Sequence, residues 1–223
     1  MNNGSLMLQK YSIKNLLLGA KALIIGGGPT TLELDRWTDV EKDVTVLTST
    51  AYLNSHLQTI QTDYFIISTQ TDFTSEEFKK WYNNNPNCKF VIESNHLWKA
   101  PNGFNNFIFN SDPIRINITP EFGVGIMGRA IMWLIETNLY STIYFVGFDG
   151  YAKDGSGQHA FHKHIKELNR QASINTYSKY LDNFTKFNSH IESIVKEKDI
   201  SLVNLGKGHP SNILSHIESK AFV

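Results

Sequence analysis

Short apolar runs rich in β-branched residues recur along the chain, with longer polar stretches between them. The runs are continuous rather than alternating, which is typical of strands covered on both faces, as in parallel sheets. Four runs are the clearest, at residues 22–25, 44–47, 64–67 and 143–146. We expect three further strands at 90–92, 107–109 and 201–205.

Helical spacing of apolar residues appears between these runs. Residues 74–83, 126–137 and 177–198 carry apolar side chains three and four positions apart, the pattern of a helix with one buried face. Strands that alternate with helices predict an α/β fold, here a Rossmann-like, mostly parallel, doubly wound sheet. We expect a single nucleotide-binding domain over 1–223, with a lead-in segment at 1–20 and an active-site loop at 150–176.

A glycine-rich turn follows the first predicted strand, where the sequence is Gly26-Gly27-Gly28-Pro29-Thr30-Thr31. Glycines let the backbone turn sharply and approach a ligand without a Cβ atom in the way. Pro29 suits the first position of a helix, and the two threonine hydroxyls would lie at the positive end of that helix. We therefore expect an anion such as a phosphate to bind here; the alternative is a strand-to-helix turn that binds nothing.

A second glycine cluster, with the spacing Gly-x-Gly-x-x-Gly, precedes the helix predicted at 126–137 and ends at Gly128. With Asp149 after the next strand, it has the form of a dinucleotide fingerprint. In that fingerprint the glycines follow a strand directly, whereas here residues 119–122 intervene. We expect these glycines to permit a tight loop and close helix packing at the edge of the site, with a nicotinamide or flavin enzyme as the alternative.

Candidate catalytic groups lie after the strand at 143–146. Asp149 follows it at the edge where open α/β sheets bind ligands, so it could orient a hydroxyl, hold a histidine, bind a metal or cap the turn at Gly150. Three of the chain's eight histidines follow at 159–164. His159 or His162 is our candidate acid–base group, because histidine titrates near neutral pH; the alternatives are a metal site and a solvated loop.

These motifs together resemble a known group of enzymes. It joins bacterial lipooligosaccharide sialyltransferases, motility-accessory-factor glycosyltransferases and hydroxymethylpterin diphosphokinase-like proteins. The resemblance rests on residues 26–32, on Gly128 before a helix, and on the strand at 143–149 that ends in Asp149. It implies nucleotide contacts at Gly26, Gly27, Gly28, Pro29, Thr30, Thr31 and Gly128. The chain departs from the pattern at Ile126-Met127, where the group has a hydroxyl or amide residue, and at 176–178, where the sialyltransferases have a catalytic histidine.

The resemblance implies a nucleotide-sugar-dependent glycosyltransferase, sialyltransferase-like, with a CMP-linked sugar as donor. One alternative is a diphosphokinase-like enzyme that uses ATP and Mg²⁺, for which Asp35, Asp63, Asp72 and Asp149 are available. Another is a relative that binds nucleotides without catalysis. We expect no tightly bound cofactor and no metal site outside the diphosphokinase alternative, and a glycan or small alcohol as acceptor.

Composition excludes some classes of partner and structure. Among the 223 residues, Lys plus Arg and Asp plus Glu balance at 21 each, so no basic excess indicates nucleic-acid binding. The single cysteine, Cys88, excludes disulfides within the chain. No apolar stretch is long enough to span a membrane, and residues 1–5 do not resemble a secretory signal. We therefore expect a cytoplasmic protein, and the resemblance implies that it can form a homo-oligomer.

Overall fold

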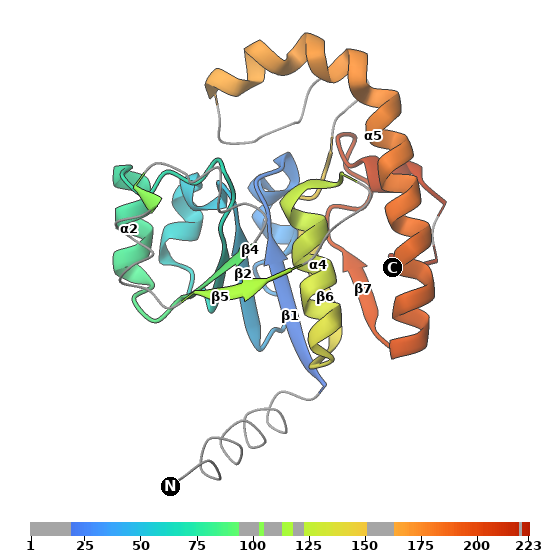
Figure 1. Cartoon of the computed structure of the whole chain (residues 1–223), viewed down its shortest axis with the longest axis horizontal. Coiled ribbons are helices and arrows are strands. Elements are labelled where there is room, and N and C mark those ends of the chain that lie inside the picture. The colour runs from blue at the N-terminus through green and yellow to red at the C-terminus, as the bar shows by residue number, and fades with distance from the viewer. Residues whose placement is uncertain (1–18, 94–102, 105–112, 118–122, 151–162, 219) are drawn as a thin grey trace, which may run out of the picture.

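Seven parallel strands form one sheet at the centre of the molecule (Figure 1). The structure is a computed structural model that describes residues 19–93, 103–104, 113–117, 123–150, 163–218 and 220–223, without the side chains of 163–176. The strand order is β5-β4-β3-β2-β1-β6-β7. The strands are β1 (Ala20–Ile25), β2 (Val44–Thr48), β3 (Tyr64–Ile66), β4 (Lys89–Glu93), β5 (Ile114–Ile116), β6 (Tyr140–Val146) and β7 (Ser201–Asn204).

The strand order reverses at β1. The chain moves outward from β1 to β5 on one side, then returns to place β6 and β7 on the other. In open parallel sheets the carboxyl ends of the strands at such a reversal diverge and leave a crevice for ligands. The fold therefore places its candidate site beside the ends of β1, β2 and β6.

Two apolar layers cover the sheet, which explains the continuous apolar runs. Along β1, Ala22 and Ile24 contact one layer, and Leu23 and Ile25 contact the other, as the period of two in a strand requires. The first layer includes α4 (Gly125–Thr137) and α5 (Lys163–Lys198), and the second includes the aromatic side chains of α2 (Glu76–Asn84). Figure 1 shows α4 in front of β1 and β6, with α5 beside β7.

The structure confirms the predicted fold class, a Rossmann-like parallel sheet with helices. The strands predicted at 22–25, 44–47, 64–67, 90–92, 143–146 and 201–205 correspond to six of the seven strands, and the predicted helices correspond to α2, α4 and the second half of α5. Strand β5 is not predicted, because three residues interrupted by Arg115 give little apolar signal. The strand predicted at 107–109 and nearly all of the lead-in segment lie outside the described residues.

Two boundaries require correction. The loop predicted at 150–176 is too long, because the backbone of α5 is helical from Lys163 onward. Residues 163–176 include good helix formers such as Lys166, Glu167 and Leu168, but Ile174 is six positions from Leu168, so the apolar residues do not mark one continuous helical face. The helix expected at Pro29 is a single 3-10 turn over Pro29–Leu32.

Within the described residues, no helix has both the length and the apolarity that a membrane span requires.

Candidate functional site

A cavity of about 370 Å³ lies at the reversal of the strand order. It is bounded by the residues that follow β1, β2, β3 and β6 and by the N-terminal turn of α4. The residues that line it are Gly27, Gly28, Thr48, Ser49, Thr50, Ser68, Thr69, Gln70, Gly123, Val124, Gly125, Ile126, Met127, Arg129, Gly147, Phe148, Asp149, Gly150, Tyr180 and Phe184. The structure thus brings together Gly27, Gly28 and Asp149 with Gly123 and Gly125 of the second glycine cluster, whereas Gly128 does not line the cavity.

One side of the cavity is formed by the turns after β1 and β6, which we call the scaffold wall (residues 26–31 and 147–150). Its glycines are required by close backbone packing. A Cβ atom on Gly28 would lie 2.3 Å from Asp149 Oδ2 and 2.7 Å from the Gly147 carbonyl oxygen. One on Gly26 would lie 2.6 Å from the same carbonyl oxygen. Gly147 itself has φ +75°, a conformation that favours glycine.

Asp149 is buried within the scaffold wall, with only 1% of its surface exposed. Its carboxylate accepts hydrogen bonds from the Thr30 backbone N–H at 2.9 Å, from the Thr30 hydroxyl at 2.8 Å and from Asn212 Nδ2 at 3.2 Å. Burial raises the pKa of Asp149, although the hydrogen bonds from Thr30 act in the opposite direction. The carboxylate therefore accepts from three protein donors, and the catalytic role expected for Asp149 stays a prediction.

The threonines after the glycines also turn inward. Thr30 and Thr31 are fully buried, and the Thr31 hydroxyl donates to the Gly26 carbonyl oxygen at 3.0 Å. Pro29 and Gly26 do not line the cavity. The N–H groups of Gly26, Gly28, Thr30 and Thr31 all have protein acceptors. Among the described residues, only the Gly27 N–H of this turn has no acceptor. The expected cradle of several amides is therefore wrong here, and one amide remains for a ligand.

We call the opposite side of the cavity the open wall (residues 48–50, 68–70, 123–127 and Arg129). It includes the N-terminal turn of α4. Gly123 and Gly125 have φ +62° and +74°, so they let the chain turn into the helix at this point. Val124, the N-cap residue, makes no side-chain capping bond, and the first turn contains no acidic residue. The N–H groups of this turn and the positive end of the helix dipole thus border the cavity and suit an anion.

Gly128 lies deeper in α4 and does not line the cavity. A Cβ atom there would lie 2.2 Å from Val124 Cγ2 and 3.4 Å from Phe187 Cε2 of α5. Its environment is that of close helix packing, and the nucleotide contact implied by the resemblance stays a prediction. The next residue, Arg129, lines the cavity, and Nη1 of its partly buried side chain forms an ion pair with Oε2 of the buried Glu93 at 2.7 Å.

Hydroxyl and amide side chains complete the open wall after β2 and β3. Ser49 Oγ lies 2.8 Å from Ser68 Oγ, and Thr50, Thr69 and Gln70 also line the cavity. Ser49 has φ +53°, which is uncommon for a residue with a side chain and occurs often at functional sites. Sequence reasoning missed these residues. The signal was their place directly after predicted strands, at the sheet edge where ligands bind.

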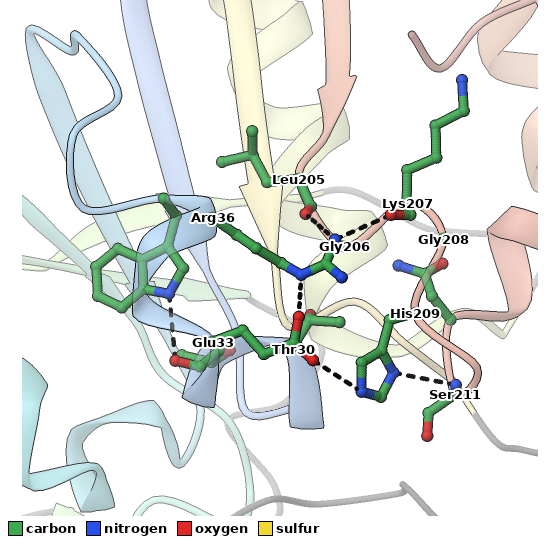
Figure 2. A network of polar contacts seen from close by, with 12 residues as sticks. Thr30, Glu33, Arg36, Leu205, Gly206, Lys207, Gly208, His209 and Ser211 are labelled. Atoms are coloured by element: carbon green, nitrogen blue, oxygen red, sulfur yellow. Dashed lines mark hydrogen bonds and ion pairs between the residues drawn. The ribbon is translucent and has the colours of Figure 1, made fainter.

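His159 and His162 lie outside the described residues, so their role stays a prediction. Figure 2 shows His209 beside the scaffold wall, with its Nε2 3.3 Å from Glu33 Oε1 and its Nδ1 accepting the Ser211 N–H at 3.1 Å. Both ring nitrogens are therefore engaged. Arg36 also pairs with Glu33 and donates to the Lys207 carbonyl oxygen at 3.0 Å, so the segment after β7 is fastened to the turn after β1.

Comparisons with known proteins covered family models, curated proteins and solved structures. No protein-family model and no curated protein matches the chain. Among solved structures, the sialyltransferase CstII from Campylobacter jejuni in complex with cytidine-5'-monophosphate is similar, with 16% identity, 92% of this chain and 86% of that chain covered, and a TM-score of 0.48. The same protein in complex with CMP-3FNeuAc is similar with 17% identity, 91% of this chain and 86% of that chain covered, and a TM-score of 0.47. The chemistry of the site must therefore be inferred from its own residues.

Proposed function

We propose that this protein is a nucleotide-sugar-dependent glycosyltransferase whose donor binds in the cavity between the scaffold wall and the open wall. The observation that carries the proposal is the uncapped N-terminal turn of α4, which borders a cavity at the reversal of a parallel sheet. A volume of 370 Å³ lies within the range of about 300–1,000 Å³ common for small-molecule sites.

Three kinds of donor would hold the phosphate. The first-turn N–H groups of α4 and the Gly27 N–H are hydrogen-bond donors, and Arg129 supplies a positive charge whose position is fixed by Glu93. Ser49, Ser68 and Gln70 on the open wall suit the hydroxyl-bearing parts of a nucleotide or sugar. The resemblance to sialyltransferases at the sequence motifs makes a CMP-linked sugar the first donor to test.

In the proposed reaction, an acceptor hydroxyl oxygen attacks the anomeric carbon of the donor. The bond between that carbon and the phosphate oxygen breaks, the nucleotide phosphate leaves with the electron pair, and a base takes the hydroxyl proton. Negative charge grows on the phosphate, where the dipole of α4 stabilises it. His159 or His162 is proposed as the base, since their segment follows directly from Gly150 on the cavity.

The diphosphokinase alternative has less support. Such chemistry uses carboxylates gathered around Mg²⁺. Of the four candidates, Asp35, Asp63 and Asp72 do not line the cavity, and Asp149 is bonded to Thr30 and Asn212. Asp63 accepts the Thr45 N–H at 2.8 Å, and Asp72 accepts the Thr74 N–H at 2.9 Å. These carboxylates therefore serve separate turns of the chain.

Calorimetric titration with CMP in the presence of a metal chelator tests the proposal, with ATP plus Mg²⁺ and NAD as comparison ligands. We expect CMP to bind, and a CMP-linked sugar to release CMP faster when a glycan acceptor is added. Binding without CMP release would identify a nucleotide-binding protein that lacks catalysis. Binding of ATP with Mg²⁺ but not of CMP, or of none of the three, would overturn the proposal.

A further inference from the structure

A buried polar cluster joins the scaffold wall to the segment after β7, where the chain leaves β1, β6 and β7. Its members are Thr30, Asp149, Asn204 and Asn212, each no more than 5% exposed. Asn212 Nδ2 lies 3.2 Å from both Asp149 Oδ1 and Asn204 Oδ1, and the Asp149 carbonyl oxygen accepts the Ile213 N–H at 2.7 Å. Three loops that are distant in the sequence are therefore joined through one carboxylate.

We infer that Asp149 is a positioning residue that, through Thr30, holds the turn after β1 so that the Gly27 N–H faces the cavity. The inference rests on the proposed function only for the use of that N–H in donor binding. The Gly147 N–H donates to Thr30 Oγ1 at 2.9 Å, so the hydroxyl proton of Thr30 is directed to Asp149. The hydroxyl thus connects the end of β6 to the carboxylate, and the turn after β1 is fixed from both sides.

The chemistry of the cluster calls for a carboxylate at this position. Three donors converge on Asp149, namely the Thr30 N–H, the Thr30 hydroxyl and the Asn212 amide. An ionised carboxylate only accepts, whereas an asparagine would bring two N–H donors of its own toward them. Burial raises the pKa of Asp149, so the charged form is held here against the preference of its surroundings. A group that is unfavourable to bury is consistent with a role in geometry.

The test compares Thr30→Val, which removes the hydroxyl and keeps the shape, with Thr30→Ser, which restores the hydroxyl. Thr62→Val is the matched control, because Thr62 is also buried but its hydroxyl donates to Ile60, away from the cavity. We measure hydrogen exchange of the Gly147 amide, the NMR shift of the Gly27 amide, and CMP affinity. A hydrogen bond of ordinary strength corresponds to a loss of about tenfold in protection.

Thr30→Val is expected to lower the protection of the Gly147 amide about tenfold, shift the Gly27 amide and weaken CMP binding. Thr30→Ser should restore all three, and Thr62→Val should change none of them. If Thr30→Val does not fold, Asp149→Asn is the test variant, and it must shift the Gly27 amide resonance. Equal Gly147 protection in the Thr30 and Thr62 variants, or an unmoved Gly27 resonance in Asp149→Asn, overturns the inference. Failure of the wild-type protein to bind CMP instead overturns the proposed function, while the two amide measurements still decide this inference.

Discussion

The scaffold wall and the open wall of the cavity differ in what their polar groups contact. On the scaffold wall, the Thr30 hydroxyl, the Asp149 carboxylate and nearly all of the turn's N–H groups bond to other parts of the protein. On the open wall, the first turn of α4 carries no side-chain cap, and Ser49, Ser68 and Gln70 line the cavity. The first glycine-rich motif thus mainly supports the fold, with the Gly27 N–H left for a ligand, and most of the groups suited to a ligand come from the open wall.

The largest effect on stability should come from adding a methyl group to the scaffold wall. In Gly147→Ala the new Cβ atom would lie 2.2 Å from Thr31 Oγ1 and 2.8 Å from the Gly26 carbonyl carbon. Overpacking together with the positive φ should lower the free energy of unfolding by at least about 3 kcal/mol. Gly125→Ala is the control, since Gly125 has a similar φ but no atom within 4 Å of the added Cβ.

For Gly125→Ala we expect a loss of only about 1 kcal/mol, from the backbone conformation alone. Urea unfolding of both variants measures the difference. Equal losses would mean that the scaffold wall is no more tightly packed than the open wall, which would contradict the comparison.

The next largest effect on stability should come from breaking the ion pair between Arg129, which lines the open wall, and Glu93. Arg129→Met leaves the Glu93 carboxylate, which is 3% exposed, without its guanidinium partner. Removal of one member of a buried pair should lower the free energy of unfolding by about 3 kcal/mol. The double variant with Glu93→Gln should recover much of that stability but not the CMP affinity. Recovery of CMP affinity in the double variant would exclude Arg129 from phosphate binding.

A smaller effect should follow the titration of Asp149. Its folded pKa is raised above the usual value of 3.8, so the folded state holds the proton more readily than the unfolded state. The stability that Asp149 contributes is therefore fully present below 3.8 and is lost as the pH rises through the raised pKa. We expect the free energy of unfolding of the wild type, relative to Asp149→Asn, to fall over that range.

Chemical denaturation of both proteins at a series of pH values checks this prediction. The charges of His209, which lowers the pKa of Asp149, and of Glu33, which raises it, act on the carboxylate in the wild type only, so their coupling to Asp149 is part of the measured difference. A difference that rises with pH would show that the hydrogen bonds from Thr30 outweigh the burial of the charge.

The smallest effect on stability should come from Ser68→Ala on the open wall. The Ser68 hydroxyl contacts Ser49 Oγ at 2.8 Å and accepts the Gln70 N–H at 3.1 Å, in a position that is only partly buried. Its loss should change the free energy of unfolding by no more than about 1 kcal/mol and yet weaken CMP binding. Unchanged CMP affinity in this variant, measured by calorimetry, would remove Ser68 from the binding surface.

The sequence predicted the fold well because buried parallel strands produce continuous apolar runs, and six strands follow from that signal alone. The sequence also singled out Gly27, Gly28 and Asp149, which line the cavity, and their roles stay predictions. It could not assign the direction of each polar group. Thr30 and Asp149 have the residue types of a ligand site, but they bond to each other across β1 and β6. That pairing depends on the register of two strands separated by more than a hundred residues, which local patterns do not encode.

The most direct measurement of the central claim is an NMR titration of the isotope-labelled protein with CMP, which follows each backbone amide. The account predicts saturable shifts at Gly27, in the first turn of α4 and at Ser68–Gln70, with smaller changes at Thr30 and Asp149. Saturable shifts confined to the side of His209 and Glu33, or the absence of saturable shifts, would contradict it.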